Sequence, residues 1–113
     1  MSVLVNFLNV MTIAELPVQI DRDKIAEFCR ARGIRKLSLF GSVIRDDFDP
    51  ARSDVDVLAE FNPEVHPGLK FFGYGEELAE ILHYRVDFNT EAWLSKSFRD
   101  EVVREALLIY EQT

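Results

Sequence analysis

The segment 54–61, with the sequence DVDVLAEF, constrains the fold of this chain more than any other. Successive side chains of a β-strand point to opposite faces, so this alternation predicts a strand with one buried face. Val55 and Val57 are expected to point into a core, while Asp54 and Asp56 project together from the opposite face. Two carboxylates on one strand face repel each other unless water, an arginine or a divalent cation offsets their charge. The segment therefore predicts both a sheet and a candidate cation site.

The rest of the chain alternates helical and extended patterns. Helices are expected over residues 21–32, 69–83 and 95–110, and strands over residues 37–40 and 85–88. One helical turn is expected after Gly41, whereas the Pro-containing stretches 46–53 and 62–68 predict loops. Asp21 is placed to cap the first helix and Gly33 to end it. This order predicts an α+β fold, close to α/β, in which a small mixed sheet is flanked by helices.

The second helix carries most of the aromatic residues whose placement bears on a partner surface. Its inward face is expected to consist of Leu69, Phe72, Leu78, Ile81 and Leu82. Four aromatic residues offer a surface for a partner protein, although aromatic residues on helices belong more often to a core: Phe71, Phe72, Tyr74 and Trp93.

The composition is that of an ordinary globular domain with an acidic surface. Of the 113 residues, 48% are hydrophobic and 29% are charged, and the formal net charge is −7. Chains of this size form one domain. An acidic surface repels phosphate backbones, so we expect no sequence-specific binding of nucleic acid. A nucleotide held through metal ions stays compatible with that charge, and a basic protein partner is favoured.

The single cysteine and the apolar N-terminal run bear on location. Cys29 cannot form a disulfide within the chain and is typical of the reducing cytoplasm. The apolar run 3–10 is far shorter than the roughly 20 residues that span a bilayer, and it lacks the basic flank of a signal peptide. We therefore expect a cytoplasmic protein with no membrane partner. Residues 1–11 are expected to form an extension or an edge strand, and residues 12–113 the domain itself.

Four further residues extend the candidate site. Asp87 lies in an apolar segment, and if its strand neighbours the Asp54 strand, three carboxylates converge in the ligand pattern of a two-metal nucleotidyl-transfer site. The alternative is an acid at a strand end that pairs with Arg85. Gly41 allows the backbone to approach a ligand closely, and the Ser42 hydroxyl favours a phosphate. Arg45 could offset the charge of a triphosphate, tether the acids, or lie on the surface as an ordinary arginine.

The combined pattern resembles a known family. The stretch LFGSVIRDDFDPARSDVDVLAEF resembles the signature of the minimal nucleotidyltransferases, or MNT domains, of the DNA polymerase beta-type nucleotidyltransferase superfamily. The later VDFNT and EALLIYE also resemble this family, so the resemblance covers about residues 12–112. It implies a polymerase beta-type nucleotidyltransferase fold. It further implies a site with a catalytic, metal-binding trio and a nucleotide-binding group: Asp54, Asp56 and Asp87, and Gly41, Ser42 and Arg45.

The resemblance implies a role for each part of that site. The trio would hold Mg²⁺, with two ions expected once the nucleotide is present. The glycine and serine would contact the β- and γ-phosphates of ATP. By the same resemblance, Asp87 is expected to help deprotonate the acceptor hydroxyl.

The resemblance also implies a biological role. Proteins similar to this chain commonly act as antitoxins of HEPN/MNT toxin–antitoxin pairs. The implied function is a Mg²⁺-dependent nucleotidyltransferase that binds a HEPN ribonuclease toxin and transfers AMP from ATP to a tyrosine on it. The small size of the chain favours an acceptor on another protein. Two alternatives stay open: an antitoxin that neutralises its toxin by binding alone, and a transferase that modifies a small molecule. Assembly with itself or with the toxin is left open as well.

Overall fold

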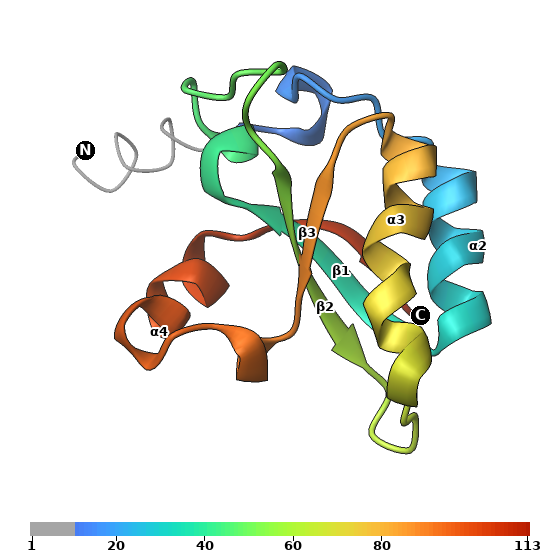
Figure 1. The fold of residues 1–113 in the computed structure, drawn as a ribbon. Coiled ribbons are helices and arrows are strands. Elements are labelled where there is room, and N and C mark those ends of the chain that lie inside the picture. Colours follow the sequence, from blue (N-terminus) through green and yellow to red (C-terminus); the bar gives the residue numbers. More distant parts are fainter. Residues whose placement is uncertain (1–10) are drawn as a thin grey trace.

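A four-stranded mixed sheet forms the centre of the fold (Figure 1). The computed structural model describes residues 11–113, so the expected extension or edge strand lies, apart from Met11, outside the described residues. The strands follow the order β3-β2-β1-β4. Their bounds are Ile34–Phe40 (β1), Val55–Phe61 (β2), Val86–Asn89 (β3) and Leu107–Glu111 (β4). Strand β1 is antiparallel to both β2 and β4, whereas β3 is parallel to β2. The predicted α+β class and mixed sheet are confirmed.

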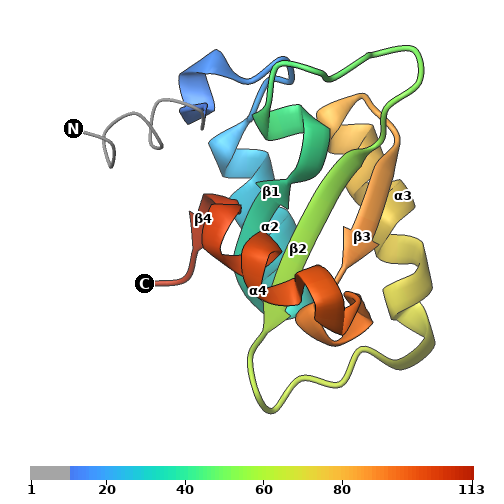
Figure 2. The same cartoon turned by 90° about the vertical axis from the view of Figure 1, so that its left-hand side faces the viewer.

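Helices lie on both faces of this sheet. Helices α2 (Arg22–Arg32) and α3 (Phe71–Leu82) pack side by side on one face, and α4 (Lys96–Glu105) crosses the other face (Figure 2). Short 3₁₀ turns connect the elements, among them η2 (Gly41–Ile44) after β1 and η4 (Glu91–Trp93) after β3. In the described residues, three α-helices thus flank the mixed sheet, as the sequence predicts.

The ends of α2 follow directly from local sequence. The Asp21 carboxylate accepts a hydrogen bond from the Lys24 amide at 3.1 Å, which satisfies one of the free N–H groups of the first turn. Gly33 ends the helix in the left-handed region, with φ of 71°. A Cβ at Gly33 would also meet the Val65 side chain at 2.5 Å, so both backbone conformation and space require glycine there. The predicted cap and stop are confirmed.

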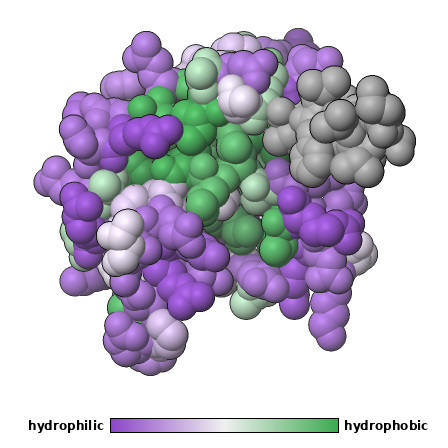
Figure 3. Space-filling model, turned by 180° about the vertical axis from the view of Figure 1, so that it is seen from behind, coloured by the Kyte–Doolittle hydropathy of each residue, from purple (hydrophilic) through white to green (hydrophobic). Residues whose placement is uncertain are grey.

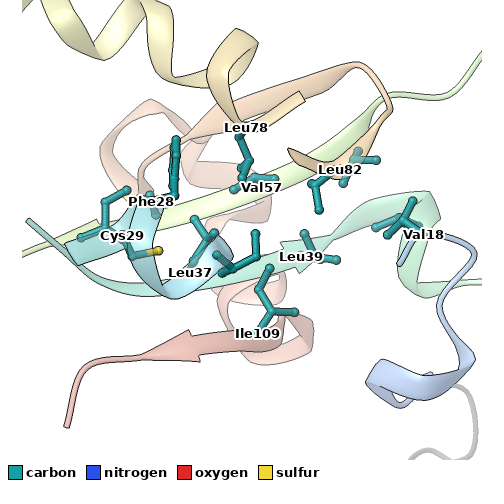
Figure 4. Close-up of a cluster of buried hydrophobic side chains, with 14 of the residues drawn as sticks. Val18, Phe28, Cys29, Leu37, Leu39, Val57, Leu78, Leu82 and Ile109 are labelled. Carbon is teal, nitrogen blue, oxygen red and sulfur yellow. The ribbon is translucent and has the colours of Figure 1, made fainter. Parts of the chain in front are cut away.

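The core fills the space between the sheet and the α2–α3 pair (Figure 4). Leu37 and Leu39 of β1 and Val57 of β2 are fully buried beneath the two helices. Their partners on the helices follow a helical spacing and point toward the strands: Phe28, Cys29, Leu78 and Leu82. The expected inward orientation of the β2 valines is confirmed, because Val55 and Val57 both have no exposed surface.

The C-terminal segment differs from the sequence prediction. A single helix is expected from the sequence over residues 95–110, but α4 ends at Glu105 and the chain continues as β4. Ala106 has extended backbone angles, with ψ of 134°, and β4 then pairs with β1 as an edge strand. The apolar run that follows fits either periodicity, and pairing with β1, which buries Ile109 to 7% exposure, selects the strand.

Two residues expected in the core are on the surface instead. Leu69 is 87% exposed and Phe72 is 69% exposed. The buried stripe of α3 consists of Tyr74, Leu78 and Leu82, which are spaced four residues apart and leave Phe72 on the opposite side. Trp93 is also 63% exposed, so two of the four aromatic candidates for a partner surface do lie on the outside.

One face of the molecule carries a hydrophobic area among hydrophilic side chains (Figure 3). Seen from behind, this area lies in the middle of the molecule between hydrophilic flanks (Figure 3). Within residues 11–113, no helix combines the length and the apolar character that a bilayer crossing requires.

Candidate active site

The carboxylates lie where β2 and β3 run in parallel. The register pairs Asp56 of β2 with Asp87 of β3, and neighbouring residues of a sheet point to the same face. Val55 and Val57 are buried on the α2–α3 face, so Asp56 projects from the face that carries α4. The expectation that these strands are neighbours is confirmed.

Asp54 lies just before β2 and is held by an arginine. The Arg85 Nε donates a hydrogen bond to Asp54 Oδ1 at 2.8 Å, and both side chains are about half exposed. One interpretation of the sequence pairs Arg85 with Asp87, but the parallel register places this arginine beside Asp54 instead. Among the described residues, no group of three or more acidic, histidine or cysteine side chains is gathered as a ready metal site. The three carboxylates share one face, but they do not converge on a single point.

The environment of Asp56 disfavours a negative charge on its side chain. Burial, followed by the nearby Asp87 and Asp54 carboxylates, raises the pKa of the Asp56 carboxyl to about 6, although Arg45 acts in the opposite direction. Both burial and the neighbouring acids therefore disfavour the charged form of this carboxyl. A divalent cation at this position would supply the missing positive charge.

Gly41 brings the turn after β1 directly against this carboxylate. Phe40 is the register partner of Asp56, and Gly41 follows with φ of 75°. Glycine suits this left-handed backbone conformation, and any other residue would also have to displace the Asp56 carboxylate, because a Cβ there would meet Asp56 Oδ2. Val43 and Ile44 of η2 are buried and anchor the turn, while Ser42 is half-buried next to Gly41. The two parts of the predicted site are therefore adjacent.

Arg45 follows the turn and has two electrostatic neighbours. It lies near enough to Asp56 to lower the pKa of that carboxyl. Its guanidinium also contacts Glu105 Oε2 at 3.4 Å, which links the turn to the end of α4. The side chain is half exposed, so it could turn toward a bound anion at small cost.

A cavity on the same face was not foreseen from the sequence. It has a volume of about 530 Å³ and lies between β1, β2 and β4 on one side and η4 and α4 on the other. Its floor includes Ser38 and Leu58, which are register partners on β1 and β2, and its walls include Val103 and Leu108. The cavity depends on the turn from α4 into β4, which a single helix over 95–110 does not contain. The alternation of polar and apolar residues in β1 and β2 is the sequence signal that could have indicated this cavity.

The remaining candidate side chains do not join the site. Cys29 is fully buried in the core, and burial raises the pKa of its thiol to about 12, so it stays a neutral packing residue. His83 ends α3 with φ of 64°, and His66 lies exposed in the loop before α3.

The amino-acid sequence also matches a known protein family. Residues 22–109 match the family described as nucleotidyltransferase domain, so the chain belongs to that family. No curated protein sequence matches the chain.

Solved structures share the same fold. A minimal nucleotidyltransferase is 29% identical, with a TM-score of 0.61, over 76% of this chain and 86% of that one. A toxin–antitoxin structure with AMP-PNP is 20% identical, with a TM-score of 0.63, over 83% and 76%. A complex of tri-AMPylated HEPN toxin with MNT antitoxin from Shewanella oneidensis gives 19% identity and a TM-score of 0.56, over 80% and 70%. Together with the family match, these likenesses confirm the resemblance to minimal nucleotidyltransferases.

Proposed function

We propose that this chain is an MNT-type antitoxin that binds a HEPN ribonuclease toxin and transfers AMP from ATP to a tyrosine of that toxin, with Mg²⁺ as cofactor. The observation that carries this proposal is the packing of Gly41 against Asp56, with Asp87 in register beside it. Two structural neighbours support it, one described with AMP-PNP and one as a tri-AMPylated HEPN toxin in complex with MNT antitoxin.

The residues present fit a hard divalent cation. Asp54, Asp56 and Asp87 offer the carboxylate oxygens that Mg²⁺ prefers, and burial together with the two neighbouring acids raises the pKa of Asp56, which a cation would offset. To join the ligands, Asp54 would exchange Arg85 for the ion. When bound, Mg²⁺ neutralises charge on the phosphate oxygens and polarises the α-phosphoryl group.

The other residues of the site would orient the nucleotide and move a proton. Gly41 and Ser42 would contact the β- and γ-phosphates, and Arg45 would offset the charge of the departing pyrophosphate. The tyrosine oxygen forms a bond to the α-phosphorus while the bond from that phosphorus to the bridging oxygen breaks. Asp87, exposed on the edge strand, would accept the hydroxyl proton.

The test is transfer of labelled AMP to a HEPN-domain protein that is mixed with this chain. With Mg²⁺ and labelled ATP we expect label on the toxin, and we expect none with Asp54→Asn or Asp56→Asn. Asp47→Asn, in the exposed loop before β2, is the matched control and should transfer normally.

Two outcomes separate the alternatives. If the folded wild-type chain transfers no label, the enzymatic form of the proposal is wrong. If the Asp56→Asn variant still neutralises the toxin completely, binding alone suffices. The exposed Phe72 and Trp93 are the observation that favours such a contact-only antitoxin.

A further inference from the structure

We propose that the cavity between the sheet and α4 is the acceptor site: it receives an aromatic side chain with a hydroxyl group from a partner protein, and the exposed aromatic residues beside it are where that partner docks. This assignment rests on the proposed function, because it deepens the account of the same site. It assigns the cavity to the acceptor and leaves the nucleoside outside it.

The phosphate turn, the carboxylates and the cavity follow one another along the sheet. Ser38 lies two residues before Phe40 on β1, and Leu58 lies two residues after Asp56 on β2. Residues two apart on a strand point to the same face and are separated by about 7 Å. The cavity therefore begins one step beyond the carboxylates on their own face, while Gly41 and the phosphate-binding turn lie at the opposite end.

The geometry of the reaction sets the side from which the acceptor oxygen approaches. In nucleotidyl transfer the attacking oxygen and the leaving oxygen lie roughly in line through the phosphorus. The turn at Gly41–Ser42 fixes the side on which pyrophosphate leaves. The attacking oxygen must therefore come from the other side of the carboxylates, which is the side of the cavity. Thr90 and Glu91, which line the cavity, follow Asp87 closely in the chain.

The side chains that line the cavity suit an aromatic group with a hydroxyl. The cavity has apolar walls with a polar rim, and six of its lining residues illustrate this: Leu58, Val103 and Leu108, and Ser38, Thr90 and Glu91. Within residues 11–113 the Ser38 and Thr90 hydroxyls make no side-chain hydrogen bond, so both can serve a ligand. An aromatic ring with one polar edge suits such walls. A phosphate group suits them less, because the charged lining residues, Lys36, Glu60 and Glu91, carry a net negative charge.

Exposed aromatic side chains lie next to the cavity. Trp93 follows the cavity-lining residue Ala92 in η4 and is 63% exposed. It stacks on Phe71 at a centroid distance of 6.0 Å and meets Phe72 edge-on at 6.4 Å. Exposed aromatic residues that are already held in place by each other are typical centres of protein interfaces. Their continuity with the cavity indicates that the acceptor hydroxyl arrives on a protein rather than on a small molecule.

Filling the cavity tests the assignment. Ala106→Phe places a ring in the cavity, and Ala31→Phe, on the exposed side of α2, is the matched control. We expect Ala106→Phe to lower the rate of AMP transfer to the toxin by about tenfold or more, with the dissociation constant for Mg²⁺–AMP-PNP unchanged. Thermal unfolding of both variants establishes that they are folded. Equal loss of nucleotide affinity, or unchanged transfer, would overturn the assignment.

A binding experiment distinguishes failure of this assignment from failure of the proposed function. The probe is N-acetyltyrosinamide, with N-acetylalaninamide as its control, and the signal is the fluorescence of Trp93, the single tryptophan of the chain. We expect saturable quenching by the tyrosine compound in the wild-type chain and in Ala31→Phe, and none in Ala106→Phe. This result would support the cavity even if no AMP transfer were found. Absence of saturable quenching in the wild-type chain would refute it.

Discussion

The two faces of the sheet use the same alternating strands in opposite ways. On the α2–α3 face, Leu39 and Val57 are fully buried and neighbouring apolar side chains fill the space between them. On the α4 face, burial and two neighbouring acids raise the pKa of Asp56, and a cavity of about 530 Å³ continues along the strands. One face provides stability, and the other keeps polar groups and space that stability alone does not require. This difference indicates where a ligand belongs.

The largest expected effect is the loss of AMP transfer when an acid on the α4 face is replaced. Asp56→Asn should lower the rate of AMP transfer by about a thousandfold or more, because it removes a proposed metal ligand at the reacting phosphate. The chain should remain folded, since the carboxylate is not part of the core. The rate is followed with labelled ATP, and circular dichroism checks the fold. A variant that keeps more than half of the wild-type rate would contradict the role of this residue.

A substitution on the α2–α3 face should instead lower the stability of the fold. Leu39→Ala should lower the free energy of unfolding by about 2–5 kcal/mol, because it leaves a cavity among fully buried side chains. Urea denaturation gives the value. Leu108→Ala, on the cavity side and 40% exposed, is the control and should cost clearly less. Equal losses at the two positions would mean that both faces are packed alike.

A single added Cβ can disturb the contact between Gly41 and Asp56. Gly41→Ala introduces a Cβ into a left-handed backbone position and against the Asp56 carboxylate. It should lower the free energy of unfolding by about 1–3 kcal/mol and weaken the binding of Mg²⁺–AMP-PNP. Gly73→Ala in α3, where a Cβ meets nothing within 4 Å, should be neutral or stabilising. Calorimetry measures both quantities, and normal nucleotide affinity in Gly41→Ala would argue against a phosphate turn here.

The pH dependence of stability tests whether the pKa of Asp56 is raised. The pKa of Asp56 is raised from 3.8 to about 6, so the folded state binds this proton more tightly than the unfolded state. Its contribution is therefore most favourable below pH 4 and is lost as the pH rises through about 6. In the absence of divalent cations, Asp56→Asn should be more stable than the wild-type chain above pH 6, and the difference should disappear below pH 4. A gap that is constant with pH would show that Asp56 is not perturbed.

The smallest expected effect concerns the arginine that holds Asp54. Arg85→Ala should strengthen binding of Mg²⁺ to the nucleotide-free chain by a few-fold, because the ion pair is half exposed and weak. Titration calorimetry at low salt measures the affinity. Arg35→Ala, which removes the exposed pair with Glu60 on the distant end of the sheet, is the control. Weaker Mg²⁺ binding in Arg85→Ala would contradict competition between arginine and ion.

The sequence predicted the parts of this molecule that depend on local patterns. The alternation in β2 correctly placed Val55 and Val57 inside, and it put the acids on the other face. The cap at Asp21 and the stop at Gly33 depend on neighbouring residues and were also predicted.

Features that depend on pairing between distant strands were not predictable. The apolar residues after Ala106 fit a helix or a strand, and only pairing with β1 selects β4. The partner of Arg85 depends on the parallel register of β2 and β3, which the sequence does not contain. The cavity was missed for the same reason, because its wall is built by the chain turning from α4 into β4.

The most direct test of the central claim is the mass of the HEPN toxin after incubation with this chain, ATP and Mg²⁺. The open face of the sheet is claimed to transfer AMP to a tyrosine, so peptide mapping should find AMP on a tyrosine of the toxin. The modification should disappear with EDTA and with Asp56→Asn, and it should persist with Asp47→Asn. A toxin that is fully neutralised but carries no AMP would contradict the claim and leave binding alone as the function.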